Sequence, residues 1–589
     1  MLKWREWVYA VLAVGLIVLQ VWLDLTLPDY MATITELAVA GSASTMGEIW
    51  KNGGLMLACA LGSALSSIAV GFFAARIAAV VSFRMRSKVF DRVEDFSMEE
   101  INRFSTASLI TRTTNDITQV QMVISMGLQV VIKAPVLAVW AICKILSRQW
   151  QWSVATAVAV AVMVAMMLVL LLAVFPKFRK IQKLTDNLNA VTRENLTGVR
   201  VVRAYNAEEY QERKFAKANE ELTGTQLFTT RAVAILSPVM TMIMSGLSLA
   251  IYWIGAYLIG ELPTGAERAA LFGQMAAFSG YAMQVVMAFM MLAIIFIILP
   301  RAMVSVRRIN EVLDTRPSIA DGSLEASPSG EAGTVEFRHV SFKYPDAGGY
   351  VLQDLSFRAE KGQTVAFIGS TGSGKSTAVN LVPRFYDATE GEVLVDGVNV
   401  RDYTLRALHD KIGYVPQRAV MFSGTVESNV AYGEKQGHEY TLDGVKEAVH
   451  IAQAADFVEA KEDGYASHVA QGGTNFSGGQ KQRLAIARAV CRKPEIFIFD
   501  DSFSALDYKT DKQLRTALKE EAGEATSLIV AQRIGTIRDA DLIIVLDEGK
   551  VAGQGTHDEL MRSCSVYREI AYSQLSKEEL ETSMGGDRA

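Results

Sequence analysis

The sequence predicts a chain in two parts, an all-α domain with six membrane-spanning helices fused to an α/β domain. Two observations lead to this fold class. Long charge-free apolar runs all lie before Pro300, whereas short β-branched runs separated by helical stretches follow residue 334. The 589 residues exceed one typical domain, and the net charge of −5 gives no whole-chain sign of nucleic-acid binding.

Five apolar runs are free of charged residues, and a bilayer-spanning helix needs about 20 such residues, so most of them are long enough. The runs are Trp7–Leu23, Asn52–Ala75, Trp152–Pro176, Ala232–Gly260 and Ala269–Pro300. A sixth span, 123–146, is interrupted by Lys133 and Lys144. These lysines either extend toward an interface, which we favour, or line a polar path.

The first run ends at Asp24, where we expect an acidic loop to begin. A cleaved signal peptide is the alternative to a retained first helix. Segments 76–118 and 177–231 are rich in Lys and Arg, while 24–50 has four acidic residues and no basic one. The positive-inside rule therefore predicts an integral membrane protein, with both termini and the α/β domain in the cytoplasm.

Changes of composition give the expected boundaries. Residues 1–310 form the membrane domain, with two long cytoplasmic loops. Residues 311–333 are polar and rich in Gly, Ser and Pro, which is typical of a linker. The α/β domain spans 334–576, and 577–589 form a polar tail. The four cysteines lack the spacing of a metal site or a disulfide framework.

A phosphate-binding loop opens the α/β domain, because the strand TVAFIG runs directly into GSTGSGKST. Its glycines let backbone N–H groups point at phosphate oxygens, and the following helix adds positive potential. Lys375 reaches the β and γ phosphates, and the Ser376 hydroxyl is a Mg²⁺ ligand. The predicted nucleotide-binding residues here are Gly369, Ser370, Thr371, Gly372, Ser373, Gly374, Lys375, Ser376 and Thr377.

A second apolar strand, IFIFD, ends at Asp500, whose carboxylate is expected to hold Mg²⁺ through water. Together the two motifs predict a nucleotide hydrolase. Between them lies NFSGGQKQRLAIARAV, residues 475–490, and here the sequence resembles the ABC transporter family. The residues that match the family's signature motif are Ser477, Gly478, Gly479 and Gln480.

This resemblance implies an ATPase domain with a RecA-like core and a helical subdomain, which uses ATP and Mg²⁺. In the family, the signature motif contacts ATP bound to the other subunit of a dimer. Tyr344 resembles the aromatic residue that stacks on adenine, and Asp507 resembles the D-loop aspartate. Gln417 resembles the Q-loop glutamine, which senses Mg²⁺ and the membrane domain.

The membrane part agrees with the same family. Residues 104–117 and 194–215 resemble the two cytoplasmic loops of ABC exporters, whose coupling helices dock on the ATPase domains. With six spans fused to one ATPase domain, the resemblance implies an exporter half-transporter of a bacterial cell membrane that must dimerise. A nucleotide-gated channel or a regulatory membrane protein is the alternative, and uptake rather than export stays open.

Two positions depart from the family pattern. Asp501 stands where the family usually has a glutamate that polarises the attacking water. Gln532 stands where a switch histidine usually contacts the γ-phosphate. The shorter carboxylate is expected to be a poor base, and glutamine cannot relay a proton as imidazole does. The expected catalytic set is therefore Asp501, Gln532 and Gln417, with Ser376, Gln417 and Asp500 at the metal.

These departures together resemble the weakened-site subunit of a heterodimeric, multidrug-type exporter. The implied partner carries the glutamate and the histidine, and the alternative is a homodimeric lipid or peptide exporter that works at a reduced rate. The expected substrates are drugs, lipids or other amphipathic small molecules. Methionine-rich spans are compatible with a multidrug cavity, although we favour ordinary packing or lipid contact as their explanation. No peptidase-like domain precedes the first run, so leader-cleaving peptide secretion is disfavoured.

Overall fold

The computed structural model describes residues 3–40, 46–263, 265–327, 332–345, 347–521 and 523–574. The predicted tail and residues 328–331, near the end of the predicted linker, lie outside these residues. The chain divides into two compact units. The unit that contains the predicted spans, here called the membrane unit, comprises Met1–Glu94 and Ala107–Thr315. The unit that contains the predicted nucleotide-binding motifs, here called the ATPase unit, comprises Asp95–Thr106 and Arg316–Ala589.

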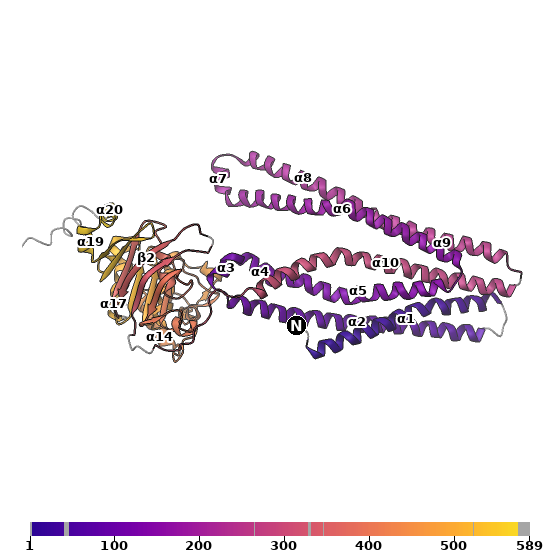
Figure 1. The fold of residues 1–589 in the computed structure, drawn as a ribbon, viewed down its shortest axis with the longest axis horizontal. Helices are drawn as coiled ribbons and strands as arrows, with labels where there is room; N and C mark the ends of the chain where they lie inside the picture. Colours follow the sequence, from indigo (N-terminus) through magenta and orange to yellow (C-terminus); the bar gives the residue numbers. More distant parts are fainter. Residues whose placement is uncertain are drawn as a thin grey trace, which may run out of the picture. The chain divides into compact units, whose positions relative to one another are not determined.

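Helices make up the described part of the membrane unit (Figure 1). They are α1 (Trp4–Ala40), α2 (Met46–Glu94), α4 (Thr106–Thr111), η2 (Arg112–Asp116), α5 (Ile117–Leu146), α6 (Trp150–Thr197), α7 (Val199–Ala204), α8 (Glu208–Ala234), α9 (Leu236–Gly260) and α10 (Gly265–Asp314). Six of the described helical segments are long and apolar enough to cross a membrane, which confirms the six predicted spans. Helix α7 lies at the tip of the hairpin formed by α6 and α8 (Figure 1).

The end predicted for the first span was wrong. Helix α1 does not stop at Asp24 but continues to Ala40, through a proline at position 28. Two of the three acidic residues of this extension, Asp24 and Asp29, are paired with lysines of α5, so they do not force the helix to end. Small residues of α10 allow α1 to approach closely: a Cβ at Gly273 would lie 2.7 Å from the Ala32 carbonyl oxygen.

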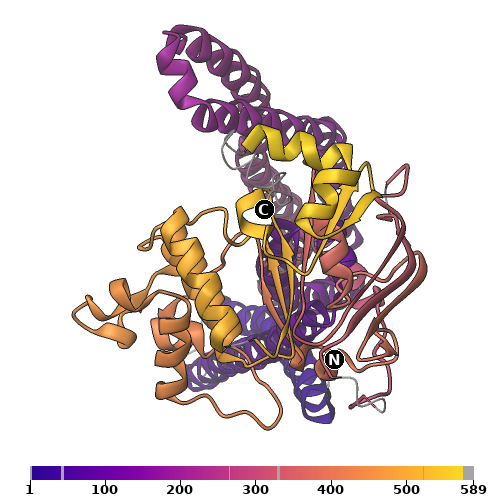
Figure 2. The ribbon, with the colours of Figure 1, turned by 90° about the vertical axis from the view of Figure 1, so that its left-hand side faces the viewer.

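Two sheets organise the ATPase unit (Figure 2). The larger has the order β12-β11-β3-β10-β9-β6, and all its neighbours pair in parallel except β12 with β11. Its strands are β3 (Thr364–Gly369), β6 (Ile412–Val415), β9 (Ile496–Asp500), β10 (Thr526–Val530), β11 (Leu542–Asp547) and β12 (Lys550–Gly555). Strand β9 is buried along its whole length, as expected for an apolar strand inside a parallel sheet.

The smaller sheet is antiparallel and has the order β2-β1-β4-β5. Its strands are β1 (Val335–Phe342), β2 (Leu352–Ala359), β4 (Glu390–Val395) and β5 (Val398–Asn399), while β7 (Gly424–Thr425) pairs with β8 (His468–Val469). The helices of this unit are α3 (Met98–Phe104), α11 (Lys375–Leu381), α12 (Leu405–Asp410), α13 (Val426–Val430), α14 (Leu442–Ile451), α15 (Ala455–Glu459), α16 (Gly478–Cys491), α17 (Tyr508–Glu521), α18 (Ile534–Ile537), α19 (His557–Ser563) and α20 (Ser565–Gln574).

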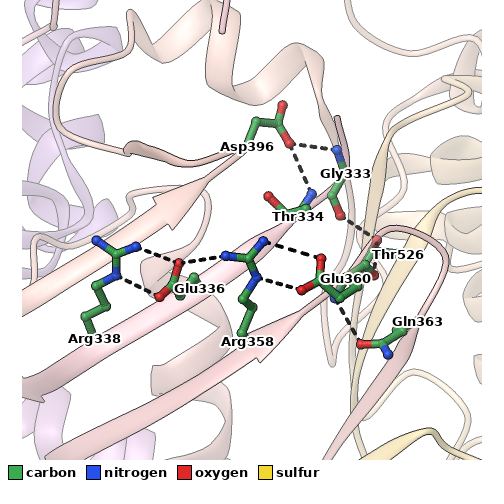
Figure 3. Close-up of polar contacts among 9 residues, drawn as sticks. All are labelled: Gly333, Thr334, Glu336, Arg338, Arg358, Glu360, Gln363, Asp396 and Thr526. Carbon is green, nitrogen blue, oxygen red and sulfur yellow. Dashed lines mark hydrogen bonds and ion pairs between the residues drawn. The ribbon is translucent and has the colours of Figure 1, made fainter. Parts of the chain in front are cut away.

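A buried polar network joins the two sheets (Figure 3). The fully buried Thr526, at the start of β10, donates its hydroxyl to the Gly333 carbonyl at 2.5 Å. Asp396, after β4, accepts backbone N–H groups from Gly333 and Thr334 at 2.7 and 3.2 Å. Buried polar groups are costly unless they are paired, so this network fixes where β1 begins against the larger sheet.

Candidate nucleotide-binding site

The phosphate-binding loop connects β3 to α11, as the sequence predicts for its strand–loop–helix context. Gly369 and Gly374 have φ of +153° and +95°, and a Cβ at either would lie closer than 3.0 Å to backbone or side-chain atoms. Gly372 also has a positive φ, of +86°, but a Cβ there would meet nothing within 4 Å. Gly369 and Gly374 are therefore required by the fold itself, whereas Gly372 borders open space on the loop.

Lys375 lies inside the curve of this loop. Its Nζ donates to the carbonyls of Gly369 and Ser370 at 2.9 and 2.7 Å. Burial lowers the pKa of Lys375, although the carboxylates of Asp500 and Asp501 oppose that shift. A desolvated ammonium group gains much from an anion, so the loop is suited to phosphate.

The predicted metal ligands Ser376 and Asp500 are in contact. The Ser376 hydroxyl, in the first turn of α11, donates to an Asp500 carboxylate oxygen at 2.6 Å. Burial raises the pKa of Asp500, and the neighbouring Asp501 carboxylate adds to that shift. A hydroxyl beside a buried carboxylate suits Mg²⁺, which takes few protein oxygens and completes its shell with phosphates and water. Among the described residues, no group of three or more His, Cys, Asp or Glu is placed to hold a metal.

The three predicted catalytic residues meet at a single oxygen atom. Asp501 follows β9, Gln417 lies just beyond β6, and Gln532 lies just beyond β10. Because β10, β9 and β6 are parallel neighbours, their carboxyl ends lie at one edge of the sheet. The Gln417 and Gln532 side-chain amides both donate to Oδ2 of Asp501, at 3.1 and 2.8 Å.

The backbone holds this carboxylate in place. Asp501 has a φ of +48°, in the left-handed region that aspartate tolerates better than most residues. Its N–H donates to the Val530 carbonyl at 3.0 Å, which ties it to the end of β10. Only 8% of Asp501 is exposed. Its carboxylate is therefore fixed in position, and two amide donors share one of its oxygens.

Tyr344, the predicted adenine-stacking residue, lies beside the helix that follows the loop. Its hydroxyl is 3.1 Å from the hydroxyl of Thr377. Its ring packs edge-on against the rings of Phe342 and Tyr386, with centroids 4.8 and 5.2 Å apart. These contacts hold the ring in a fixed orientation next to the phosphate-binding loop.

Sequence reasoning missed Tyr386. Besides packing on Tyr344, its hydroxyl accepts a hydrogen bond of 3.0 Å from Asn102 of α3, which belongs to the first predicted cytoplasmic loop. Burial raises the pKa of Tyr386. Glu100 of the same helix accepts the backbone N–H of Ser318 at 2.9 Å. The stretch RFYDATEG carries no spacing that signals this contact, so it emerges only from the fold.

The signature residues lie apart from the phosphate-binding loop and the contacts of Asp501. Ser477 caps α16, where its hydroxyl accepts the Gln480 N–H at 3.3 Å and its own N–H donates to the Gln480 side chain at 2.9 Å. Ser477 and Gly478 are exposed. A Cβ at Gly479 would lie 3.3 Å from the Ala505 carbonyl, so the helix begins against the loop before Asp507.

Asp507 caps the start of α17. It accepts the backbone N–H and the hydroxyl of Thr510, at 3.0 and 2.8 Å. These hydrogen bonds lower the pKa of Asp507. Within the described ranges, no hydrogen bond or ion pair joins Asp507 or the signature residues to the phosphate-binding loop.

Comparisons with known proteins agree with this geometry. The model of the ABC transporter transmembrane region matches residues 10–289, and that of the ABC transporter domain matches residues 352–504. An uncharacterized ABC transporter ATP-binding protein of Mycobacterium tuberculosis is 39% identical over 567 residues, covering 96% of this chain and 94% of the relative. An ATP-dependent lipid A-core flippase of Pseudomonas fluorescens is 31% identical over 516 residues, covering 88% and 84%.

A solved structure of a bacterial Atm1-family ABC exporter with ATP bound has a similar fold. The TM-score is 0.79 at 25% sequence identity, over 97% of this chain and 98% of the other. The chain therefore belongs to the ABC transporter family, as an exporter-type member whose transmembrane and ATP-binding domains share one polypeptide.

Proposed function

We propose that this chain is one half of a heterodimeric exporter in a bacterial cell membrane, with its ATPase domain and both termini in the cytoplasm. Its own site binds ATP but hydrolyses it slowly. Its signature motif, Ser477 to Gln480, completes the hydrolytic site of a partner subunit that supplies the glutamate and histidine missing here. ATP binding draws the two ATPase domains together, and hydrolysis at the complete site separates them again.

The contacts of Asp501 carry this proposal. A general base must accept a proton from water, but Oδ2 of Asp501 already accepts amide hydrogens from Gln417 and Gln532. The side chain is also one methylene shorter than glutamate, and a misplacement of about 1 Å can cost on the order of 100-fold in rate. Gln532 donates a hydrogen bond but holds no mobile proton. All three features favour binding over turnover.

Mg²⁺ fits the oxygen pair of Ser376 and Asp500, with Gln417 as the third protein group proposed at the ion. When bound, the ion would neutralise phosphate charge and offset the cost of burying the Asp500 carboxylate. Lys375 and the loop N–H groups bind the phosphates, and Tyr344 orients the adenine. None of these roles depends on a strong base, so nucleotide affinity is expected to be intact.

The exposed position of Ser477 and Gly478 supports their use by a second subunit. They begin a helix of 14 residues, whose first N–H groups attract a γ-phosphate. The proposed cargo is a membrane lipid, a drug or another amphipathic small molecule. The 31% identity to a relative named as a lipid A-core flippase supports the lipid class.

Hydrolysis by the chain alone tests the proposal. The chain is purified alone into lipid vesicles and compared with the chain co-expressed with the product of its neighbouring gene. We expect the chain alone to be nearly silent and the pair to hydrolyse ATP, because only the pair contains a complete site. Transporter-like hydrolysis by the chain alone would instead establish the homodimer.

A further inference from the structure

Charged side chains lie inside two of the membrane-spanning helices. Asp24 and Asp29 are in α1, while Lys133 and Lys144 are in α5, and Arg148 follows α5. A charge at membrane depth is costly, so such residues pair with each other and mark functional paths more often than chance. Both lysines are paired with acidic side chains of α1.

These ion pairs form two groups that differ in net charge. Asp24 pairs with Lys133 at 3.2 Å and accepts a hydrogen bond of 2.5 Å from the Ser63 hydroxyl of α2. This group, here called the inner group, is neutral. Asp29 faces two cations, Lys144 at 2.7 Å and Arg148 at 3.2 Å.

The Asp29 group also includes Tyr281 of α10, whose hydroxyl donates to the same carboxylate. Lys144 Nζ lies 5.9 Å from the centre of the Tyr281 ring. This outer group therefore carries one positive charge beyond what its carboxylate balances. It draws residues from α1, the end of α5 and α10 into one cluster.

Most of the unused hydrogen-bonding capacity of the outer group consists of donors. Both oxygens of Asp29 already accept hydrogen bonds, from Lys144 on one side and from Arg148 and Tyr281 on the other. Each of the two cations donates a single hydrogen bond to Asp29, whereas an ammonium has three N–H groups and a guanidinium has five. Their side chains are 34% and 27% exposed, so a ligand can reach them.

We propose that Lys144 and Arg148 bind the anionic headgroup of an amphipathic ligand, one that carries a phosphate or a carboxylate. One cation would suffice to neutralise Asp29, so the second leaves a positive charge that a bound anion would balance. Arg148 presents a planar fork that matches such groups, and Asp29 holds both cations in position. The inference rests on the proposed export of amphipathic molecules, for which it specifies the charge.

The test measures binding without nucleotide, so it does not depend on hydrolysis. Dodecyl phosphate is titrated calorimetrically into the full chain in phosphatidylcholine nanodiscs, with dodecyl maltoside as the uncharged probe. We expect Arg148→Gln to weaken dodecyl phosphate binding by about fivefold. Asp29→Asn is expected to tighten it by about the same factor, because the group then carries two unbalanced cations. The affinity for dodecyl maltoside should stay the same in both variants.

A paired variant provides the control. Asp24→Asn combined with Lys133→Gln removes the neutral inner pair and is expected to leave dodecyl phosphate affinity unchanged. A purely structural cluster would give weaker binding in both Asp29→Asn and Arg148→Gln, and that result would overturn the proposal. So would an unchanged affinity in Arg148→Gln. If this binding test failed while the chain alone hydrolysed almost no ATP and the co-expressed pair did, the proposed function would stand and only the anion site would be rejected.

Phosphatidylglycerol nanodiscs distinguish the source of the anion. If this lipid reduces dodecyl phosphate binding in the unaltered chain but not in Arg148→Gln, the ligand is a membrane lipid headgroup. If it leaves binding unchanged in both, the site takes a free anionic amphiphile.

Discussion

Replacing Asp501 by glutamate and Gln532 by histidine in the same chain is expected to raise the ATPase rate of the purified chain by about 100-fold. The longer carboxylate reaches the attacking water, and removal of the Gln532 amide takes away the donor that lies 2.8 Å from Oδ2 of Asp501. Imidazole in its place adds a group that can carry charge at the γ-phosphate. The rate is measured in lipid vesicles, with cross-linking to verify that the chains are paired.

A matched variant isolates the base. Asp501→Asn with Gln532→His has the same histidine but no carboxylate at 501, so we expect no gain in rate. Glutamate is less suited than aspartate to the φ of +48° at this position, so the activated variant should lose about 1 kcal/mol of stability. An unchanged rate in a chain that cross-links as a dimer would show that the weakness of the site lies elsewhere.

Alanine at both Ser477 and Gly478 is expected to reduce ATP hydrolysis by the co-expressed pair about 100-fold or more. The change removes the Ser477 hydroxyl and adds a Cβ to the exposed first turn of α16, at the end proposed to face the partner's γ-phosphate. Asp501→Ala in the same pair should reduce the rate far less, because its own site contributes little turnover. Equal losses from the two changes would contradict an asymmetric pair.

Loss of a helix cap needs its own control, because Ser477 also pairs with Gln480 in a capping box. Thr556 caps α19 in the same arrangement, with Glu559 as its partner. Thr556→Ala should therefore lower stability by about 1 kcal/mol, as a lost cap does, while hydrolysis by the pair remains. If Thr556→Ala also abolished hydrolysis, the effect at Ser477 would reflect folding rather than chemistry.

Much of the ATPase site follows from sequence because its residues sit where strands end. The glycine loop after β3 and the acidic end of β9 are visible as local patterns, and the parallel sheet brings them together. That Gln417 and Gln532 share one oxygen of Asp501 depends on the strand order β10-β9-β6. Local patterns do not encode this order, so the sequence predicts the set of residues but not their contacts.

The wrong end predicted for the first span and the failure to predict Tyr386 have a common physical origin. A charge in an apolar run predicts a helix end only when nothing pairs with it, and Asp29 is paired with residues more than 100 positions away. Tyr386 likewise receives its hydrogen bond from Asn102, which is distant in sequence. Such long-range pairs are invisible to reasoning from local periodicity, whereas the six spans depend only on length and apolarity.

The fate of ATP bound to the chain alone tests the central claim most directly. The chain in lipid vesicles is loaded with radiolabelled ATP and Mg²⁺, free nucleotide is removed, and the bound nucleotide is identified over time. If Asp501 and Gln532 mark a site that binds without efficient turnover, the label is recovered as ATP long after the co-expressed pair has converted its own to ADP. Recovery of ADP from the chain alone at the rate of the pair would contradict the account.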